Sequence, residues 1–131
     1  MTSTTELDTA VAALTAHLPI GGVLVAEPWW FPEQFLDGHI GHDVAERDGQ
    51  TVVRLVRTTL DQGTARLEAH YSTADATGIR SFVHVQRFTL FTEAEYRAAF
   101  ERAGCEVEYL ADPGVTMTST GRGLLVGVRQ R

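Results

Sequence analysis

The sequence predicts a mixed α/β protein of the α+β kind, because three patterns of apolar residues follow one another along its 131 residues. Apolar residues first recur at helical spacing, and a short apolar run follows them. About fifty central residues then alternate with the two-residue period of β-strands and are divided by turn residues. We therefore expect one domain, residues 1–131, with three core strands, two helices and a four-stranded antiparallel insert at about residues 42–90.

The first helix is predicted over about residues 5–18. Ser3 and Glu6 have the spacing of a capping box, in which each side chain bonds the amide of the other residue. The apolar residues that follow share one helical face: Leu7, Val11, Leu14 and Leu18. Pro19 and the Gly21–Gly22 turn end this helix. The run Val23–Ala26 then favours a buried parallel strand whose carboxyl end leads into a binding loop.

The central segment is predicted to form an antiparallel meander. Asp48–Gly49 is a strong signal for a two-residue hairpin turn. Residues 64–73 alternate cleanly, with Ala65, Ala69 and Tyr71 on one face and polar residues such as His70 on the other. Such alternation is typical of a sheet with one packed face and one face that is wet or lined by ligand.

The last third of the chain is predicted to contain one helix and two strands. Thr92 and Glu95 form a second capping-box pattern, and Gly104 is the residue type that ends helices. Strands are expected over Cys105–Leu110 and Arg122–Val128, with a loop rich in Thr, Ser, Gly and Pro over residues 111–121.

Composition excludes several kinds of protein. The formal charge of −6 disfavours a nucleic-acid partner, because phosphate binding requires a positive surface. All 11 basic residues are arginine, so no lysine can form a Schiff base or act as a general base. The single cysteine, Cys105, rules out an intramolecular disulfide and is expected to be buried and inert. No apolar run is long enough to cross a membrane, and we expect a cytoplasmic protein.

Three strings carry a family resemblance. LPIGGVLVAEPWWFPEQF begins at residue 18, FTLFTEAEYRAAFERAGCEVEYL begins at residue 88, and GRGLLVGV begins at residue 121. The first resembles the entry to the fifth strand of class I S-adenosylmethionine-dependent methyltransferases. Together they are similar to the N,N-dimethyltransferases of nucleotide-linked amino-deoxysugars. The resemblance implies a truncated methyltransferase-like fold that corresponds to the C-terminal half of those enzymes.

The part of the family pattern that binds the methyl donor is missing from this sequence. Class I enzymes hold the cofactor with a glycine-rich turn after strand one and an acid at the end of strand two. No such turn follows a predicted strand here, since Gly121–Arg122–Gly123 leads into a strand instead. We therefore expect no cofactor to bind to this chain alone. The strand edge and sheet face that the missing half would cover are expected to pair with another chain.

The predicted substrate site follows the first strand. Trp29, Trp30 and Phe31 lie between two prolines, and in the similar family this loop adjoins the sugar pocket. Glu27 stands at the strand's carboxyl end, where open α/β sheets bind ligands. Arg122 lies in the GRG string that the resemblance places near the carrier diphosphate. The structural alternatives are core packing for the aromatics, amide capping for Glu27 and a surface ion pair for Arg122.

The meander supplies three candidate acid–base residues, His70, His84 and Tyr71. Two histidines on adjacent strands that face one cavity would suit proton transfer, although a solvated sheet face would have the same sequence. The HIGHD string at residues 39–43 has a spacing that could hold a metal, but it lacks a further strong ligand nearby. We expect exposed histidines there and no metal site.

Two classes of function remain open from the sequence. The first is a methyltransferase-like substrate-binding module of natural-product or deoxysugar biosynthesis that lacks its own donor site. The second is a cofactor-free cyclase or isomerase that acts on a natural-product intermediate. A fragment of an active sugar N-methyltransferase is a further alternative. The expected ligand is a nucleotide-linked sugar or a polyketide-like molecule. The expected partner is a second copy, with residues 20–30 or the meander at the interface, or a complementing methyltransferase half.

Overall fold

The computed structural model describes residues 1–111 and 123–131. Its internal contacts divide the chain into two compact units. The first unit combines Met1–Phe35 with Leu90–Arg131, and the second is Leu36–Thr89. The second unit corresponds to the predicted insert, which therefore begins about six residues earlier than the sequence pattern indicated.

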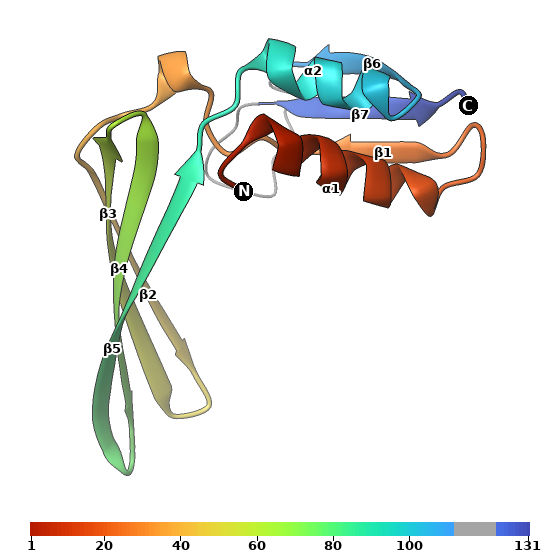
Figure 1. Cartoon of the computed structure of the whole chain (residues 1–131). Coiled ribbons are helices and arrows are strands. Elements are labelled where there is room, and N and C mark those ends of the chain that lie inside the picture. The colour runs from red at the N-terminus through yellow and green to blue at the C-terminus, as the bar shows by residue number, and fades with distance from the viewer. Residues whose placement is uncertain (112–122) are drawn as a thin grey trace. The chain divides into compact units, whose positions relative to one another are not determined.

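The first unit is a three-stranded antiparallel sheet with two helices (Figure 1). The strand order is β1-β7-β6, so the last strand in sequence lies in the centre. Both helices pack on one face of this sheet, where their apolar residues meet those of β7. The elements are α1 (Thr4–Ala16), β1 (Val23–Ala26), the 3₁₀ helix η1 (Pro32–Gln34), α2 (Glu93–Arg102), β6 (Cys105–Leu110) and β7 (Leu124–Arg129).

Both helices begin at the predicted caps. The Thr92 hydroxyl accepts from the Glu95 amide at 3.1 Å, and the Glu95 carboxylate accepts from the Thr92 amide at 2.8 Å, so α2 has a complete capping box. The Ser3 hydroxyl caps α1 by accepting from the Glu6 amide at 3.2 Å. The Glu6 carboxylate accepts from the Thr2 amide. The predicted box at α1 is therefore only half formed.

The core of the first unit lies between the helices and the sheet. Phe100 and Leu125 are its largest fully buried side chains. Gly127, in the central strand, faces the Phe100 ring so closely that an added Cβ would collide with it. The buried cluster consists of Leu7, Val11, Phe91, Ala99, Phe100, Cys105 and Leu125. Cys105 is buried as predicted.

The prediction that Val23–Ala26 is a buried parallel strand is wrong. In the described residues β1 pairs only with β7, and the pairing is antiparallel. Leu24 and Ala26 pack against the core, whereas Val23 and Val25 are 51% and 53% exposed. The two valines lie on the sheet face opposite the helices, because successive side chains of a strand point to opposite faces.

The second unit is the predicted four-stranded antiparallel meander. Its strands are β2 (His39–Arg47), β3 (Gln50–Asp61), β4 (Thr64–Asp75) and β5 (Gly78–Thr89), in the order β2-β3-β4-β5. Asp48 and Gly49 have φ of 51° and 75°, and Gln62 and Gly63 have φ of 50° and 78°. Two successive positive φ angles are typical of the type I′ turn, which matches the twist of the strands it joins.

The two faces of the meander differ in burial. One face carries Val56, Thr58, Ala65 and Ala69, all buried, as the alternation of residues 64–73 predicted. The other face carries seven large apolar side chains that are 39–77% exposed. We call this second set the apolar meander face: Ile40, Val44, Val53, Leu55, Ile79, Val83 and Val85. The prediction of a polar outer face holds for β4 but not for its neighbours.

No helix within the described ranges has the length and apolar character that a membrane span requires.

Candidate functional site

The candidate substrate site lies at one end of the three-stranded sheet. Ala26 pairs with Leu125, and Leu110 pairs with Leu124. The carboxyl ends of β1 and β6 therefore lie beside the start of β7. Glu27 extends directly from this end of β1. The chain therefore leaves β1, leaves β6 and enters β7 at the same end of the sheet.

Gly123 enters β7 at this same end and needs to be glycine. Its φ is +102°, and a Cβ there would lie 2.9 Å from the Tyr109 hydroxyl oxygen and still closer to the Leu110 carbonyl oxygen. Only glycine adopts such a φ without strain and allows so close an approach. The second glycine of the GRG string therefore serves backbone packing. Arg122, the predicted diphosphate ligand, lies outside the described residues.

Phe31 anchors the aromatic loop in the first unit. Its side chain is 3% exposed, and its ring centroid lies 5.6 Å from that of Tyr109 and 6.2 Å from that of Tyr96, both edge to face. Aromatic rings in this geometry add to the free energy of burial. For Phe31 the core-packing alternative is therefore correct, and its predicted role in binding substrate is not supported.

Trp29 and Trp30 form a separate, half-buried cluster with Phe35. The two indole centroids lie 6.3 Å apart, and each lies 6.1 Å from the Phe35 centroid. Phe35 reaches the tryptophans because η1 turns the chain back directly after Phe31. The sequence analysis missed Phe35, although a proline followed by an acid after WWF was a signal for a helical turn. The partly exposed rings offer apolar faces to a ligand.

Tyr96 supports the loop from α2. Burial, and to a lesser degree the neighbouring Glu95 carboxylate, raises the pKa of the Tyr96 phenol above its usual value. Its ring contacts Phe91 at 5.7 Å as well as Phe31. At neutral pH Tyr96 is therefore a neutral aromatic support for the loop rather than a proton acceptor.

The meander does not bring the three acid–base candidates together. His70 pairs with Val83, while His84 pairs with Ala69 and Tyr71 with Phe82. His70 therefore lies on the apolar meander face, and His84 and Tyr71 lie on the opposite face. The prediction that two histidines face one cavity is wrong, because their positions differ by one residue in register.

His70 adjoins a hollow on its face of the meander. Its Nε2 lies 3.6 Å from a Glu68 carboxylate oxygen, and the other oxygen accepts from Arg66 at 3.2 Å. The hydrogen bond from Arg66 lowers the pKa of the Glu68 carboxyl, and His70 contributes in the same direction. The hollow measures about 210 Å³ and is lined by Ile40, Leu55, Val56, Arg57, Glu68 and His70. It is shallow and mainly apolar, which suits packing better than proton transfer.

The remaining chemical groups form no metal centre in the described ranges. His39 and His42 lie in β2, three residues apart, so their side chains point to opposite faces. No cluster of three or more His, Cys, Asp and Glu side chains with metal-binding geometry occurs among the described residues.

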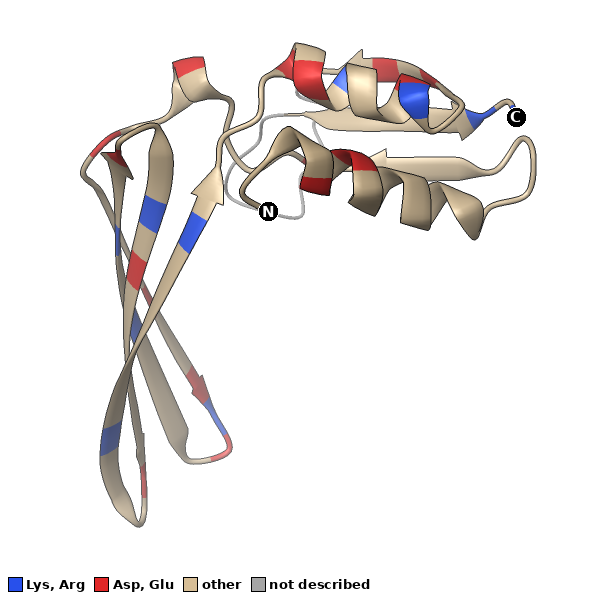
Figure 2. Ribbon diagram, in the orientation of Figure 1, with Lys and Arg blue, Asp and Glu red and all other residues tan. Residues whose placement is uncertain are grey.

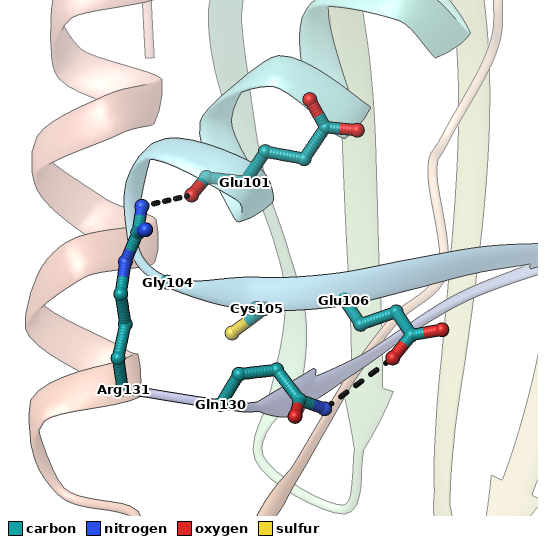
Figure 3. Close-up of a pocket in the computed structure, with 6 residues that line it drawn as sticks. All are labelled: Glu101, Gly104, Cys105, Glu106, Gln130 and Arg131. Atoms are coloured by element: carbon teal, nitrogen blue, oxygen red, sulfur yellow. Dashed lines mark hydrogen bonds between the residues drawn. The ribbon is translucent and has the colours of Figure 1, made fainter.

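A second hollow of about 230 Å³ lies near the C-terminus (Figure 3). Arg131 donates to the Glu101 carbonyl oxygen and Gln130 donates to the Glu106 carboxylate, both at 3.5 Å. The Glu101 carboxylate points away from these contacts. None of the predicted site residues lines this hollow, and its polar groups are engaged in holding the chain end to α2 and β6.

The described residues do not fit the donor-binding pattern of class I methyltransferases. Two strands lead directly into helices, β1 into η1 and β5 into α2. Neither connection, residues 27–31 or residues 90–92, contains a glycine. A backbone that approaches a cofactor closely needs glycine at such a turn.

Comparison with known proteins finds that the chain is similar to sugar N,N-dimethyltransferases. No family model matches the chain. The chain is 48% identical, over 96% of its length, to the dTDP-3-amino-3,4,6-trideoxy-alpha-D-glucopyranose N,N-dimethyltransferase of Streptomyces venezuelae. It is 42% identical to the dTDP-4-amino-2,3,4,6-tetradeoxy-D-glucose N,N-dimethyltransferase of Saccharopolyspora spinosa. The chain spans about half the length of these relatives, 52% and 50%.

Solved structures give the same result. Streptomyces venezuelae DesVI superposes with a TM-score of 0.86 at 48% identity, and the match covers 97% of this chain and 52% of that one. The sugar N-methyltransferase KedS8 from Streptoalloteichus gives a TM-score of 0.82 at 54% identity, over 98% of this chain and 51% of that one. The predicted resemblance to amino-sugar N,N-dimethyltransferases and the predicted fold class are confirmed.

Proposed function

We propose that this chain carries the sugar-binding part of a methyltransferase-like protein that acts on a nucleotide-linked amino-deoxysugar in antibiotic biosynthesis. The observation that supports this most strongly is the 48% identity to a dTDP-amino-sugar N,N-dimethyltransferase over 96% of the chain. The aromatic loop and Glu27 at one sheet end agree with it, because ligands of open α/β sheets bind beyond strand ends.

The residues at the sheet end have distinct parts in this proposal. The exposed faces of Trp29 and Trp30 stack against the sugar or the base of the ligand. The Glu27 carboxylate accepts hydrogen bonds from sugar hydroxyl groups. Arg122 binds the diphosphate through its planar fork of donors. Phe31 and Tyr96 hold the loop in place without contacting the ligand.

The methyl donor is not bound by this chain alone in our proposal. The glycine-free connections after β1 and β5 support this. Transfer of a methyl group then requires a complementing methyltransferase half. If the chain is one part of a longer N-methyltransferase, the same residues would bind the sugar of its substrate.

Calorimetric titration tests both parts of the proposal. A dTDP-linked amino-deoxysugar should bind saturably, and S-adenosylmethionine should give no saturable heat at micromolar concentrations. Arg122→Ala should weaken sugar-nucleotide binding by about ten- to a hundredfold, since a charge-assisted contact contributes roughly 1.5–3 kcal/mol. Micromolar binding of S-adenosylmethionine to this chain would contradict the proposed lack of a donor site.

The same titration separates the sugar ligand from a polyketide-like one. An apolar ligand would depend on aromatic burial, so Trp30→Ala would then weaken binding more than Arg122→Ala. Arg122→Ala should therefore weaken binding more than Trp30→Ala for a sugar nucleotide, and less than Trp30→Ala for a polyketide-like ligand. Small, equal effects would mean that neither side chain lines the binding site. A cofactor-free cyclase or isomerase that uses two histidines receives no support from the meander, since His70 lies on the opposite face from His84 and Tyr71.

The proposed assembly is a homodimer. The edge of β1 that does not face β7 has no partner strand among the described residues, and Val23 and Val25 are exposed beside it. A complementing half would cover this edge. The meander is the alternative location for contact between two copies.

A further inference from the structure

The rings of Trp29, Trp30 and Phe35, which we call the aromatic cluster, are inclined to one another. Their centroids form a nearly equilateral triangle with sides of 6.1, 6.1 and 6.3 Å, and their planes meet at angles of 58° to 85°. All three residues are half-buried. A flat sugar or base stacks only on a ring that is parallel to it. Such a group can therefore lie on only one of these rings at a time.

A small cation suits inclined rings better than a flat group does. The π-face of an aromatic ring attracts a cation that lies within about 6 Å of the ring centroid, and tryptophan attracts it most strongly. A point just above the middle of the triangle satisfies this condition for all three rings at once, because no side is longer than 6.3 Å. Partial burial strengthens the attraction by removing water from the cation. The aromatic cluster therefore has a spacing suited to an ammonium group.

The loop holds the aromatic cluster in place without a ligand. Phe31 is 3% exposed and anchors the loop in the core. The Gln34 amide donates to the Phe31 carbonyl oxygen at 3.0 Å, and the Phe35 amide donates to the Pro32 carbonyl oxygen at 3.4 Å. These bonds close the turn that brings Phe35 back to the tryptophans. A ligand that meets a site already formed loses little affinity to the ordering of the loop.

The charge around the aromatic cluster also favours a cation. Residues 1–46 contain seven acidic residues and neither arginine nor lysine. Figure 2 accordingly shows no basic position on α1, β1 or η1. Glu27 precedes the two tryptophans and is half-buried, and Glu33 follows them in η1. Carboxylates that surround a partly buried surface raise the local concentration of cations.

We propose that the aromatic cluster binds the amino group of the nucleotide-linked sugar as an ammonium ion, with the Glu27 carboxylate as its counter-charge. The inference rests on the proposed function and identifies the part of the ligand that the loop recognises. An aliphatic amine is protonated at neutral pH, as lysine is. The sugar ring lies on one indole face, and its ammonium group lies against the inclined rings. N-methylated ammonium groups bind most tightly, because their methyl groups bury additional apolar area.

Matched ligands test whether the charge is recognised. Two dTDP-linked deoxyhexoses are compared that differ at one carbon, where one carries a dimethylamino group and the other a hydroxyl group. Calorimetric titration at neutral pH should show that the dimethylamino sugar binds about five- to thirtyfold more tightly. The sugar with an unmethylated amino group should lie between the two. A simple ion pair with Glu27 would instead favour the unmethylated ammonium group, which has more N–H donors.

Substitutions of rings by leucine test whether the aromatic cluster is responsible. Trp30→Leu and Phe35→Leu keep an apolar side chain and remove a π-face, so each should reduce the preference for the dimethylamino sugar severalfold. Phe35→Leu should leave the affinity for the hydroxyl sugar nearly unchanged. Phe82→Leu is the control, because Phe82 is an aromatic residue of the meander that is 55% exposed. This control should keep the full preference, and far-ultraviolet circular dichroism should show the same fold in every variant.

Tryptophan fluorescence gives a readout at the site itself. Trp29 and Trp30 are the two tryptophans of the chain, so indole emission reports on the aromatic cluster. Tetramethylammonium chloride should change this emission saturably at millimolar concentrations. Sodium chloride at the same ionic strength should not. Phe35→Leu should weaken the response to tetramethylammonium, and Phe82→Leu should not.

Three results would overturn the inference. Equal affinity for the dimethylamino and hydroxyl sugars would exclude recognition of the charge and would leave the proposed sugar binding intact. Tightest binding of the unmethylated amino sugar would assign recognition to a carboxylate rather than to the rings. A preference that persists in both Trp30→Leu and Phe35→Leu would place the ammonium group elsewhere. If neither sugar nucleotide binds, the proposed function itself fails, and a missing response to tetramethylammonium would then exclude the cation site as well.

Discussion

Adjacent residues in the aromatic loop have different physical roles. Phe31 is buried against Tyr96 and Tyr109, while Trp29 and Trp30 keep part of their rings exposed. The prolines on either side limit the conformations of the loop, which helps to keep the adjacent side chains in these different environments. The string that resembles a binding motif therefore contains a residue that packs in the core, Phe31, and two residues with exposed ring surface, Trp29 and Trp30.

Replacement of Phe31, the buried residue of the loop, should lower the stability of the fold. Phe31→Ala removes a side chain that is 3% exposed and should lower the free energy of unfolding by about 3–5 kcal/mol. Trp30→Ala, at the adjacent and half-buried position of the same loop, should cost clearly less. Urea unfolding followed by circular dichroism measures both. Equal losses for the two variants would mean that Trp30 is also a core residue.

Tyr96 gives the stability of the first unit a dependence on alkaline pH. Its pKa is raised in the folded chain, whereas in the unfolded chain it ionises near pH 10. Its contribution is therefore fully present below about pH 10 and is lost as the pH rises towards the folded pKa. Urea unfolding at pH 8 and above pH 10 should show this loss, and Tyr96→Phe should reduce it. An identical pH dependence in Tyr96→Phe would contradict the assignment.

At the scale of elements, the cap of α2 is the clearest case in which sequence alone predicts structure. Thr92→Ala should lower the free energy of unfolding by about 1 kcal/mol, because the Glu95 amide loses its acceptor. Thr92→Ser, which keeps a hydroxyl at the cap, is the control and should retain most of the stability. If both substitutions destabilise equally, the methyl group of Thr92 matters more than its hydrogen bond.

Local patterns were sufficient where local chemistry decides the conformation. The caps, the Asp48–Gly49 turn and the end of α2 at Gly104 follow from residue type and spacing alone. The neighbour of β1 could not be predicted, because an apolar run does not specify which strand pairs with it. The sequence did contain the signal for the opposite faces of His70 and His84. A two-residue turn pairs Asp75 with Gly78, and this register puts Ala69, not His70, opposite His84.

In the candidate site, too, local sequence patterns predicted some features, while others depended on long-range contacts. Placement of Glu27 and the tryptophans at a sheet end followed from a strand followed by Pro and aromatics. Inclusion of Phe35 depended on the η1 turn, and the burial of Phe31 depended on contacts with α2 and β6, which lie far away in sequence. Long-range contacts of this kind leave no spacing pattern in the sequence.

At the scale of the whole molecule, the two units differ in what stabilises them. The principal buried cluster lies entirely in the first unit, between the helices and the three-stranded sheet. In the meander the side chains that are more than nine-tenths buried are few and mostly small, Val56, Thr58, Ala65 and Ala69. A sheet needs a packed apolar face for independent stability. The meander therefore depends on cover for its apolar face, which a second copy would supply if the proposed homodimer uses this surface.

A homodimer that uses the meander, the alternative contact in the proposed assembly, predicts hydrogen exchange that changes with concentration in one unit only. Dilution below the dimer dissociation constant should speed amide exchange in β3, β4 and β5, because the sheet then opens locally at a lower free-energy cost. Amides of α1, α2 and β7 should exchange at the same rate at both concentrations, since their cluster is complete within one chain. Val83→Asp should show the fast meander exchange even at high concentration, whereas Val25→Asp should not. Exchange in the meander that is slow and independent of concentration would show that one chain stabilises the sheet without a second copy.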